Sequence, residues 1–327
     1  MSFDIHTHFI SQEFLELIAK PGSVWHTELQ KRGEQTWVVH EQGYAYPLVR
    51  GFYDSGARLA DMARMKVDMA AVSAAPQMFY YWAEPKLGLE VARLTNDGIH
   101  RLTEEHPGKF LGMGTLPMQD LDLATRELRR CVDALGFRAI MIGSNVEGVQ
   151  FDDPRFLPFF KECEFRRVFI FFHPYISAGR RVFTKYYLTN LYGNPMDTAM
   201  AIASLIFGGV LEKCPGLKVG FPHGGGFFPY QLGRLEHGYE VRSEPKVNGA
   251  KSPEQYLNQL YFDSIVFKDK QLRFLVDVAG ADHVMLGTDY AFDMGMSAPV
   301  DFIHGAGLPP AQTHAILGEN ARKIFGF

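Results

Sequence analysis

The stretch that decides the fold is Phe3-Asp4-Ile5-His6-Thr7-His8, a short apolar run that ends in two histidines two residues apart. Side chains at positions i and i+2 leave the same face of a strand, so His6 and His8 can point at one metal ion. Imidazole is a ligand for zinc and related metals, but two ligands on one strand need other chain segments to complete a site. We therefore expect further strands that end in histidine or aspartate. The alternative for the pair alone is a solvated strand end.

Seven further apolar segments have the composition of strands, and helical segments separate most of them. This alternation is typical of a parallel sheet in an α/β protein, and eight such units close into a (β/α)8 TIM barrel. No linker rich in Pro, Gly or Ser divides residues 1–327, so we expect one domain, with a last helix at residues 311–323 outside the barrel. The later strands are expected at residues 69–73, 110–116, 137–142, 167–172, 217–221, 261–266 and 283–286.

Residues 21–55 interrupt this pattern after the first strand. Within them, residues 36–40 and 44–48 have strand composition and flank the turn at residues 41–43. We therefore expect a small β-hairpin insertion that forms a flap.

Composition excludes several classes of function. The chain has 327 residues, a net charge of -4 and a pI near 6.3, which gives no basic footprint for nucleic acid. Cys131, Cys163 and Cys214 are an odd, widely spaced set, which favours buried thiols in the reducing cytoplasm over disulfides or a zinc finger. We expect no signal peptide and no membrane span, because no apolar run is long enough for either.

Metal-competent side chains end four of the eight expected strands. His6 and His8 end the first strand, His173 ends the fifth, His223 the sixth and Asp289 the eighth. In a barrel of parallel strands the chemistry sits at the carboxyl ends, whose loops surround one mouth. The five side chains are therefore expected to converge on one rim.

These strand ends resemble the amidohydrolase superfamily. Within it, the chain is most similar to the branch of metal-dependent decarboxylases, through residues 78–83, 114–117, 221–226 and 286–290, so the likeness covers nearly the whole chain. The superfamily motifs are Asp4-x-His6-x-His8, the lone His173, His223-Gly224-Gly225-Gly226 and Gly287-Thr288-Asp289.

The resemblance implies one zinc ion, with a water molecule completing its coordination. A metal lowers the pKa of bound water to near 7, where a neighbouring imidazole also titrates, so His223 is expected to act as general acid/base with Asp289 assisting. From the residues alone, Asp289 could instead cap a following helix, and His173 could be a buried structural histidine. The sequence His223-Gly224-Gly225-Gly226 could exist only because the backbone turns tightly there, and not because His223 is catalytic. The ligands implied are His6, His8, His173 and Asp289.

The number of metals follows from the fourth strand. Binuclear members of the superfamily bridge two metals with a carboxylated lysine there, but residues 138–143 contain no lysine. We therefore expect one metal per chain, zinc or another divalent transition metal.

Two arginines match positions that bind substrate carboxylates in the decarboxylases. Arg50 follows the expected flap, and Arg234 lies shortly after the His223 loop. In those relatives the second arginine reaches in from a neighbouring subunit, so the resemblance implies a homodimer. The planar guanidinium group of arginine can bind both oxygens of a carboxylate, which fits a role in substrate binding. The alternative is that the two arginines only form salt bridges at the protein surface.

The resemblance also implies a carbon–carbon lyase that removes carbon dioxide from a small unsaturated or aromatic carboxylic acid. Asn190 stands where the decarboxylase carries tryptophan, and Ala291 stands where proline is usual, which indicates a reshaped pocket. One rival is a hydrolase or hydratase of a small amide, lactone or unsaturated acid on the same barrel. The other is a catalytically silent binding protein, against which the intact His223 argues.

Overall fold

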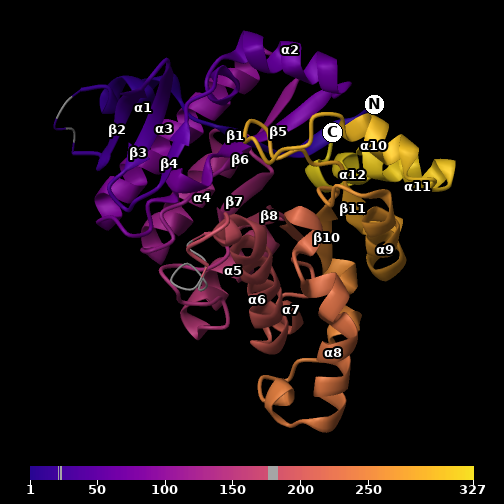
Figure 1. The fold of residues 1–327 in the computed structure, drawn as a ribbon. Coiled ribbons are helices and arrows are strands. Elements are labelled where there is room, and N and C mark those ends of the chain that lie inside the picture. The colour runs from indigo at the N-terminus through magenta and orange to yellow at the C-terminus, as the bar shows by residue number, and fades with distance from the viewer. Residues whose placement is uncertain (21, 23, 176–182) are drawn as a thin grey trace.

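Eight parallel strands form the barrel that the sequence predicts (Figure 1). The computed structural model describes residues 1–20, 22, 24–175 and 183–327. The strands pair in the order β1-β5-β6-β7-β8-β9-β10-β11, and β11 returns to β1 through the hydrogen bond from Ile5 N–H to the Leu286 carbonyl, 2.9 Å long. The strands are β1 (Phe3–Phe9), β5 (Met69–Ala74), β6 (Phe110–Gly114), β7 (Ala139–Gly143), β8 (Phe169–His173), β9 (Val219–Phe221), β10 (Leu260–Asp263) and β11 (Val284–Met285).

The strands are buried on both faces, which explains their unbroken apolar composition. Every residue of β1, β7 and β8 is buried, because alternate side chains face the barrel interior and the surrounding helices. The same geometry buries the polar residues that end the strands, since they point into the mouth and not into solvent.

Helices cover the outside of the barrel. Aspartate side chains cap two of them: Asp54 accepts a hydrogen bond from Ala57 N–H, and Asp120 accepts one from Leu123 N–H. The C-terminal segment packs outside as predicted, as two helices joined by a π-helical turn. The helices are α1 (Gln12–Ile18), α2 (Ser55–Met65), α3 (Pro85–Glu105), α4 (Leu121–Asp133), α5 (Leu157–Phe165), α6 (Asn194–Phe207), α7 (Val210–Lys213), α8 (Phe228–Val241), α9 (Asp269–Ala279), α10 (Pro299–Gly305), α11 (Pro310–His314) and α12 (Asn320–Phe325).

The insertion is a three-stranded antiparallel sheet, not the predicted two-stranded hairpin. β2 (Thr27–Arg32) pairs along its full length with β3 (Gln35–His40), which also pairs with β4 (Ala45–Pro47). The prediction missed β2 because its sequence, TELQKR, is mostly polar and exposed and has no apolar run. The flap, defined here as β2, β3 and β4, lies beside α1 (Figure 1).

In the described part of the chain, no helix combines the length and the apolar character that crossing a membrane requires.

Candidate metal centre

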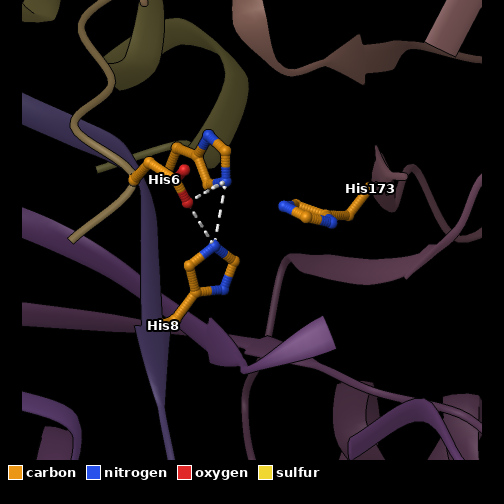
Figure 2. Close-up of side chains that lie close together, drawn as sticks. His6, His8 and His173 are labelled. Atoms are coloured by element: carbon orange, nitrogen blue, oxygen red, sulfur yellow. Dashed lines mark hydrogen bonds and ion pairs between the residues drawn. The ribbon is translucent and has the colours of Figure 1, made fainter. Parts of the chain in front are cut away.

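Three histidines and one aspartate meet at the carboxyl ends of the strands, as the sequence predicts. His6, His8 and His173 point toward one another from β1 and β8 (Figure 2). With Asp289 they are buried, and their candidate ligand atoms all lie within 4.8 Å of one another. His8 Nε2 lies 3.1 Å from His6 Nε2 and 2.9 Å from Asp289 Oδ1.

Backbone carbonyls fix the proton positions on two of the rings. His8 Nδ1 lies 3.0 Å from the Ala74 carbonyl, and His173 Nδ1 lies 3.0 Å from the Pro174 carbonyl. A carbonyl only accepts, so each Nδ1 carries the proton and each Nε2 of the neutral ring has a lone pair. Burial lowers the pKa of His8 and lowers that of His173 well below its ordinary value, which keeps both rings neutral.

A carboxylate orients the third ring. His6 Nδ1 lies 2.8 Å from Asp263 Oδ2, at the end of β10. Burial opposes the charged form of His6, but the bond to Asp263 and nearby carboxylates outweigh it and raise its pKa. The other oxygen of Asp263 accepts from the N–H groups of Gly224 and Ile265. A carboxylate behind a ligating imidazole typically fixes its orientation and makes it a better ligand.

The donor set fits a divalent transition metal. Three Nε2 atoms and a carboxylate oxygen face one point, and His173 Nε2 has no hydrogen-bond partner among the described residues. Lone pairs held this close repel one another unless a cation lies between them. Hydrogen bonds and charges from His223, His6 and His8 overcome burial and hold the pKa of Asp289 well below its usual range, so it is a charged ligand.

The loop after β11 places Asp289 by backbone bonds to β1. Asp289 N–H donates to the His6 carbonyl at 2.9 Å, and Asp289 has φ of 60° in the left-handed region. Asp4 of β1 accepts hydrogen bonds from the N–H and the hydroxyl of Thr288. These bonds also hold the loop after β11 against β1. Burial raises the pKa of Asp4 to about 7. No helix starts at Asp289, since the next described one begins at Pro299, so the helix-cap alternative is wrong.

His223 lies beside the ligand group without joining it. It begins the short helical turn at residues 223–225, with φ of 54°, and its Nε2 lies 3.6 Å from Asp289 Oδ2. Its Nδ1 has no partner in the described ranges. Gly224 has φ of +61°, and a Cβ there would meet Val266 at 2.5 Å, so the glycine run also serves a tight backbone. Non-glycine residues in this region of φ are uncommon and concentrate at functional sites.

A cavity of about 470 Å³ borders this centre, and His173, Asp289 and His223 form part of its wall. Its size and its mixture of aromatic and polar walls are typical of a small-molecule site. Both positions that depart from the family pattern, Asn190 and Ala291, line it. The flap, the π-helical turn at residues 189–193 and the loop after β11 form much of the wall. The lining includes Trp37, His40, Tyr46, Phe52, Trp82, His173, Tyr175, Asn190, Asn194, His223, Asp289 and Phe292.

The two predicted arginines lie outside that lining. Arg50 pairs with Asp54, and its side chain is 72% exposed. It lines a separate hollow of about 360 Å³. Arg234 is exposed on α8. Within one chain, therefore, neither arginine reaches the metal centre.

Sequence reasoning missed Asp263 and the flap residues. Asp263 ends a strand with a carboxylate, so the rule that found Asp289 would have found it, but the expected strand at residues 261–266 ran past it. The flap residues carry no comparable signal, because only folding brings them to the barrel mouth.

The chain matches known proteins along its whole length. The amidohydrolase family profile matches residues 3–327. The chain belongs to this family. A 2-amino-3-carboxymuconate-6-semialdehyde decarboxylase from Dictyostelium discoideum is 36% identical over 329 residues, which cover 100% of this chain and 92% of that protein.

More distant proteins resemble the chain in sequence or in fold. A gamma-resorcylate decarboxylase from Rhizobium sp. (strain MTP-10005) is 28% identical and covers 72% of this chain and 76% of its own. A solved dihydroxybenzoic acid decarboxylase from Polaromonas sp. JS666, with bound manganese and the inhibitor 2-nitroresorcinol, superposes with a TM-score of 0.82 at 22% identity. That superposition covers 99% of this chain and 96% of the other.

Proposed function

We propose that this amidohydrolase is a metal-dependent decarboxylase, a carbon–carbon lyase acting on a small unsaturated or aromatic carboxylic acid. The observation that carries the proposal is the buried group of His6, His8, His173 and Asp289, which borders an aromatic cavity through His173 and Asp289, with His223 beside it. The similarity to decarboxylases over the whole chain supports it. We further propose that residues 1–327 form one catalytic domain, with residues 21–55 as its flap.

The proposed metal is zinc, one ion per chain. Three imidazoles and one carboxylate suit zinc, and manganese is the rival because a structural neighbour binds it. All of β7 is apolar, with no lysine to bridge a second metal. When bound, such an ion polarises substrate oxygens and stabilises developing negative charge.

His223 is the proposed proton donor. When the bond between the substrate carbon and its carboxylate breaks, carbon dioxide leaves and the electron pair stays on that carbon. His223 gives the proton that forms the new C–H bond, and solvent restores that proton afterwards. Asp289 holds the imidazole in place from 3.6 Å and completes the ligand group.

We propose that Arg50 and Arg234 bind the substrate carboxylate across a homodimer interface. Exposed aromatic side chains lie on α8 and beside it: Tyr230, one turn before Arg234, is 79% exposed and contacts Phe274 at 6.1 Å between ring centroids. Tyr192 and Phe227 form a second exposed pair at 5.8 Å. Exposed aromatic groups of this kind mark protein interfaces, which supports a second copy of this chain on this face.

The proposed location is the cytoplasm. Cys131, Cys163 and Cys214 are buried free thiols. Free, unpaired cysteines suit a reducing compartment.

Product analysis separates decarboxylation from its rivals. The protein, loaded with zinc or with manganese, is incubated with carboxylated aromatics, unsaturated acids and lactones, and carbon dioxide and all other products are measured. We expect carbon dioxide in equal amount to a product that has lost one carboxyl group. Hydrolysis or hydration without carbon dioxide would make the chain a hydrolase or hydratase, and binding without turnover would make it a silent relative.

A further inference from the structure

A fully buried arginine lies behind the metal centre without an acidic partner. Arg58 of α2 is 1% exposed, and no carboxylate of the described residues forms an ion pair with it. Burial lowers the pKa of Arg58 to about 10, so the guanidinium group is still charged at neutral pH. Arginine is rarely buried to this extent unless a carboxylate balances its charge, so the position of Arg58 calls for an explanation.

Two hydrogen bonds join Arg58 to the strand that carries the ligands His6 and His8. Arg58 Nη1 donates to Thr7 Oγ1 at 3.0 Å, and Nη2 donates to the His8 carbonyl. The Thr7 hydroxyl donates to the Ala71 carbonyl at 2.7 Å, so it can only accept from Arg58. Because Thr7 and the two ligands leave opposite faces of β1, Arg58 fixes the backbone of a ligand residue from the helix layer outside the barrel.

The same guanidinium group contacts the loop that carries Asp289. Arg58 Cζ lies 5.0 Å from the centre of the Tyr290 ring, a distance at which a cation and an aromatic ring attract each other. Tyr290 directly follows the ligand Asp289, and its carbonyl accepts a hydrogen bond from His8 N–H at 2.5 Å. One side chain thus contacts both chain segments that supply His8 and Asp289.

A second residue of α2 holds the same tyrosine. The Tyr290 hydroxyl donates to Asp61 Oδ2 at 2.8 Å, and Asp61 lies on the same helix as Arg58. Tyr290 borders the separate hollow of about 360 Å³, so the surrounding side chains do not enclose it completely. The contacts with Arg58 and Asp61 therefore restrain the ring where packing alone leaves space beside it.

We propose that Arg58 is a positioning residue of the metal centre, which holds the His8 and Asp289 segments at the spacing that the bound ion requires. The inference rests on the proposed metal-dependent function. It explains why this buried arginine has no carboxylate partner, because a carboxylate would compete for the N–H groups that now bind Thr7 and His8. It also explains the choice of arginine: a planar guanidinium group can donate two hydrogen bonds and lie over an aromatic ring at once, which an ammonium group cannot do.

The test uses Arg58→Lys, which keeps the buried charge but loses the planar group, so any effect on the metal comes from the geometry of the contacts. Zinc affinity is measured by competition with a chelator, and the arrangement of the ligands is read from the visible spectrum of the protein loaded with cobalt(II). Arg58→Lys should bind zinc about 10- to 100-fold more weakly and should change the cobalt spectrum. Tyr290→Leu, which removes the ring that Arg58 contacts, should shift both readings in the same direction.

Two control variants separate positioning from general destabilisation. Arg64→Lys makes the same substitution at an exposed arginine of α2, and Met62→Ala weakens the apolar core under that helix. Both should keep the zinc affinity and the cobalt spectrum of wild type, because neither removes a contact with the His8 or Asp289 segment.

Wild-type affinity and spectrum in Arg58→Lys would overturn the proposal, and so would an equal loss of zinc in Met62→Ala. If Arg58→Lys does not fold, Tyr290→Leu decides in the same way, since Tyr290 is only half-buried at the edge of a hollow. The measurement needs no turnover, so its result is separate from the choice between decarboxylation and hydrolysis. A folded wild-type protein that binds neither zinc nor cobalt would refute the metal centre itself, and this inference would fail with it.

Discussion

The metal centre and the flap wall belong to one cavity but are completed in opposite ways. At the metal centre the barrel fixes each imidazole from behind, through the Ala74 and Pro174 carbonyls and Asp263. At the flap wall the protein fixes the His40 ring through Thr27 but leaves its outer nitrogen unpaired. The barrel therefore holds the candidate metal ligands on their outer side, whereas the insertion contributes wall residues whose polar atoms are only partly paired.

The two regions also differ in what supports them. The metal ligands stand on barrel strands and on the loop bonded to β1, so any shift of a ligand disturbs the central core. The flap residues Val38 and Tyr46 pack in a separate apolar cluster with Phe14 of α1 and Val91 of α3. Each of the following predictions tests this division.

The largest effect is expected at the edge of the metal centre. Replacing His223 with Ala should lower turnover by about 10² to 10⁴, the usual share of general acid/base catalysis, while metal content and folding stay near normal. His237→Ala is the matched control, since that histidine is exposed on α8. Loss of metal in the His223 variant would make His223 a ligand, and nearly unchanged turnover would assign the proton to another group.

The arginines test whether a third region, the partner subunit, completes the cavity. Arg50→Ala and Arg234→Ala should each weaken transition-state binding by roughly 2 to 5 kcal/mol, while Arg242→Ala should have little effect. If each site combines Arg50 of one chain with Arg234 of the other, random mixing of the two variants restores about one quarter of wild-type activity. No recovery, with subunit exchange confirmed independently, would refute a shared site.

A substitution of Asp263 tests how much the carboxylate behind His6 contributes to metal affinity. Asp263→Asn replaces one carboxylate oxygen with an NH2 group. The side chain can then no longer accept hydrogen bonds from His6 on one side and from the N–H groups of Gly224 and Ile265 on the other. Metal affinity should fall by about 10- to 100-fold, the usual effect of losing such a partner. A metal competition titration measures this against Asp282→Asn, an exposed aspartate. Unchanged affinity would show that His6 needs no support.

The smallest effect concerns stability and comes from the flap wall. His40 has a folded pKa of about 4 against an ordinary 6.5, so the unfolded chain binds its proton first as pH falls. The stability that neutral His40 contributes is therefore complete above pH 6.5 and is lost progressively toward pH 4. Between about pH 7 and about pH 5.5, wild type should lose about 1 kcal/mol more than His40→Phe. Parallel curves in denaturant titrations would contradict this.

The sequence predicted the metal centre better than the flap for a physical reason. Strand ends of a parallel barrel meet at one rim whatever the details, so His173 and Asp289 could be assigned from their place after apolar runs. The unpaired atoms of His40 and Tyr46 depend on long-range packing against Thr27 and Tyr80, which no local pattern encodes. β2 was missed for a related reason, since a mostly polar edge strand lacks the apolar run that marks a buried one.

Elemental analysis of the purified protein tests the central claim most directly. We predict about one divalent metal per chain, mainly zinc, and almost none in His173→Ala, because the barrel fixes all four ligands in space before the ion binds. Two metals per chain at full occupancy, or no metal in a folded wild-type protein, would contradict the account.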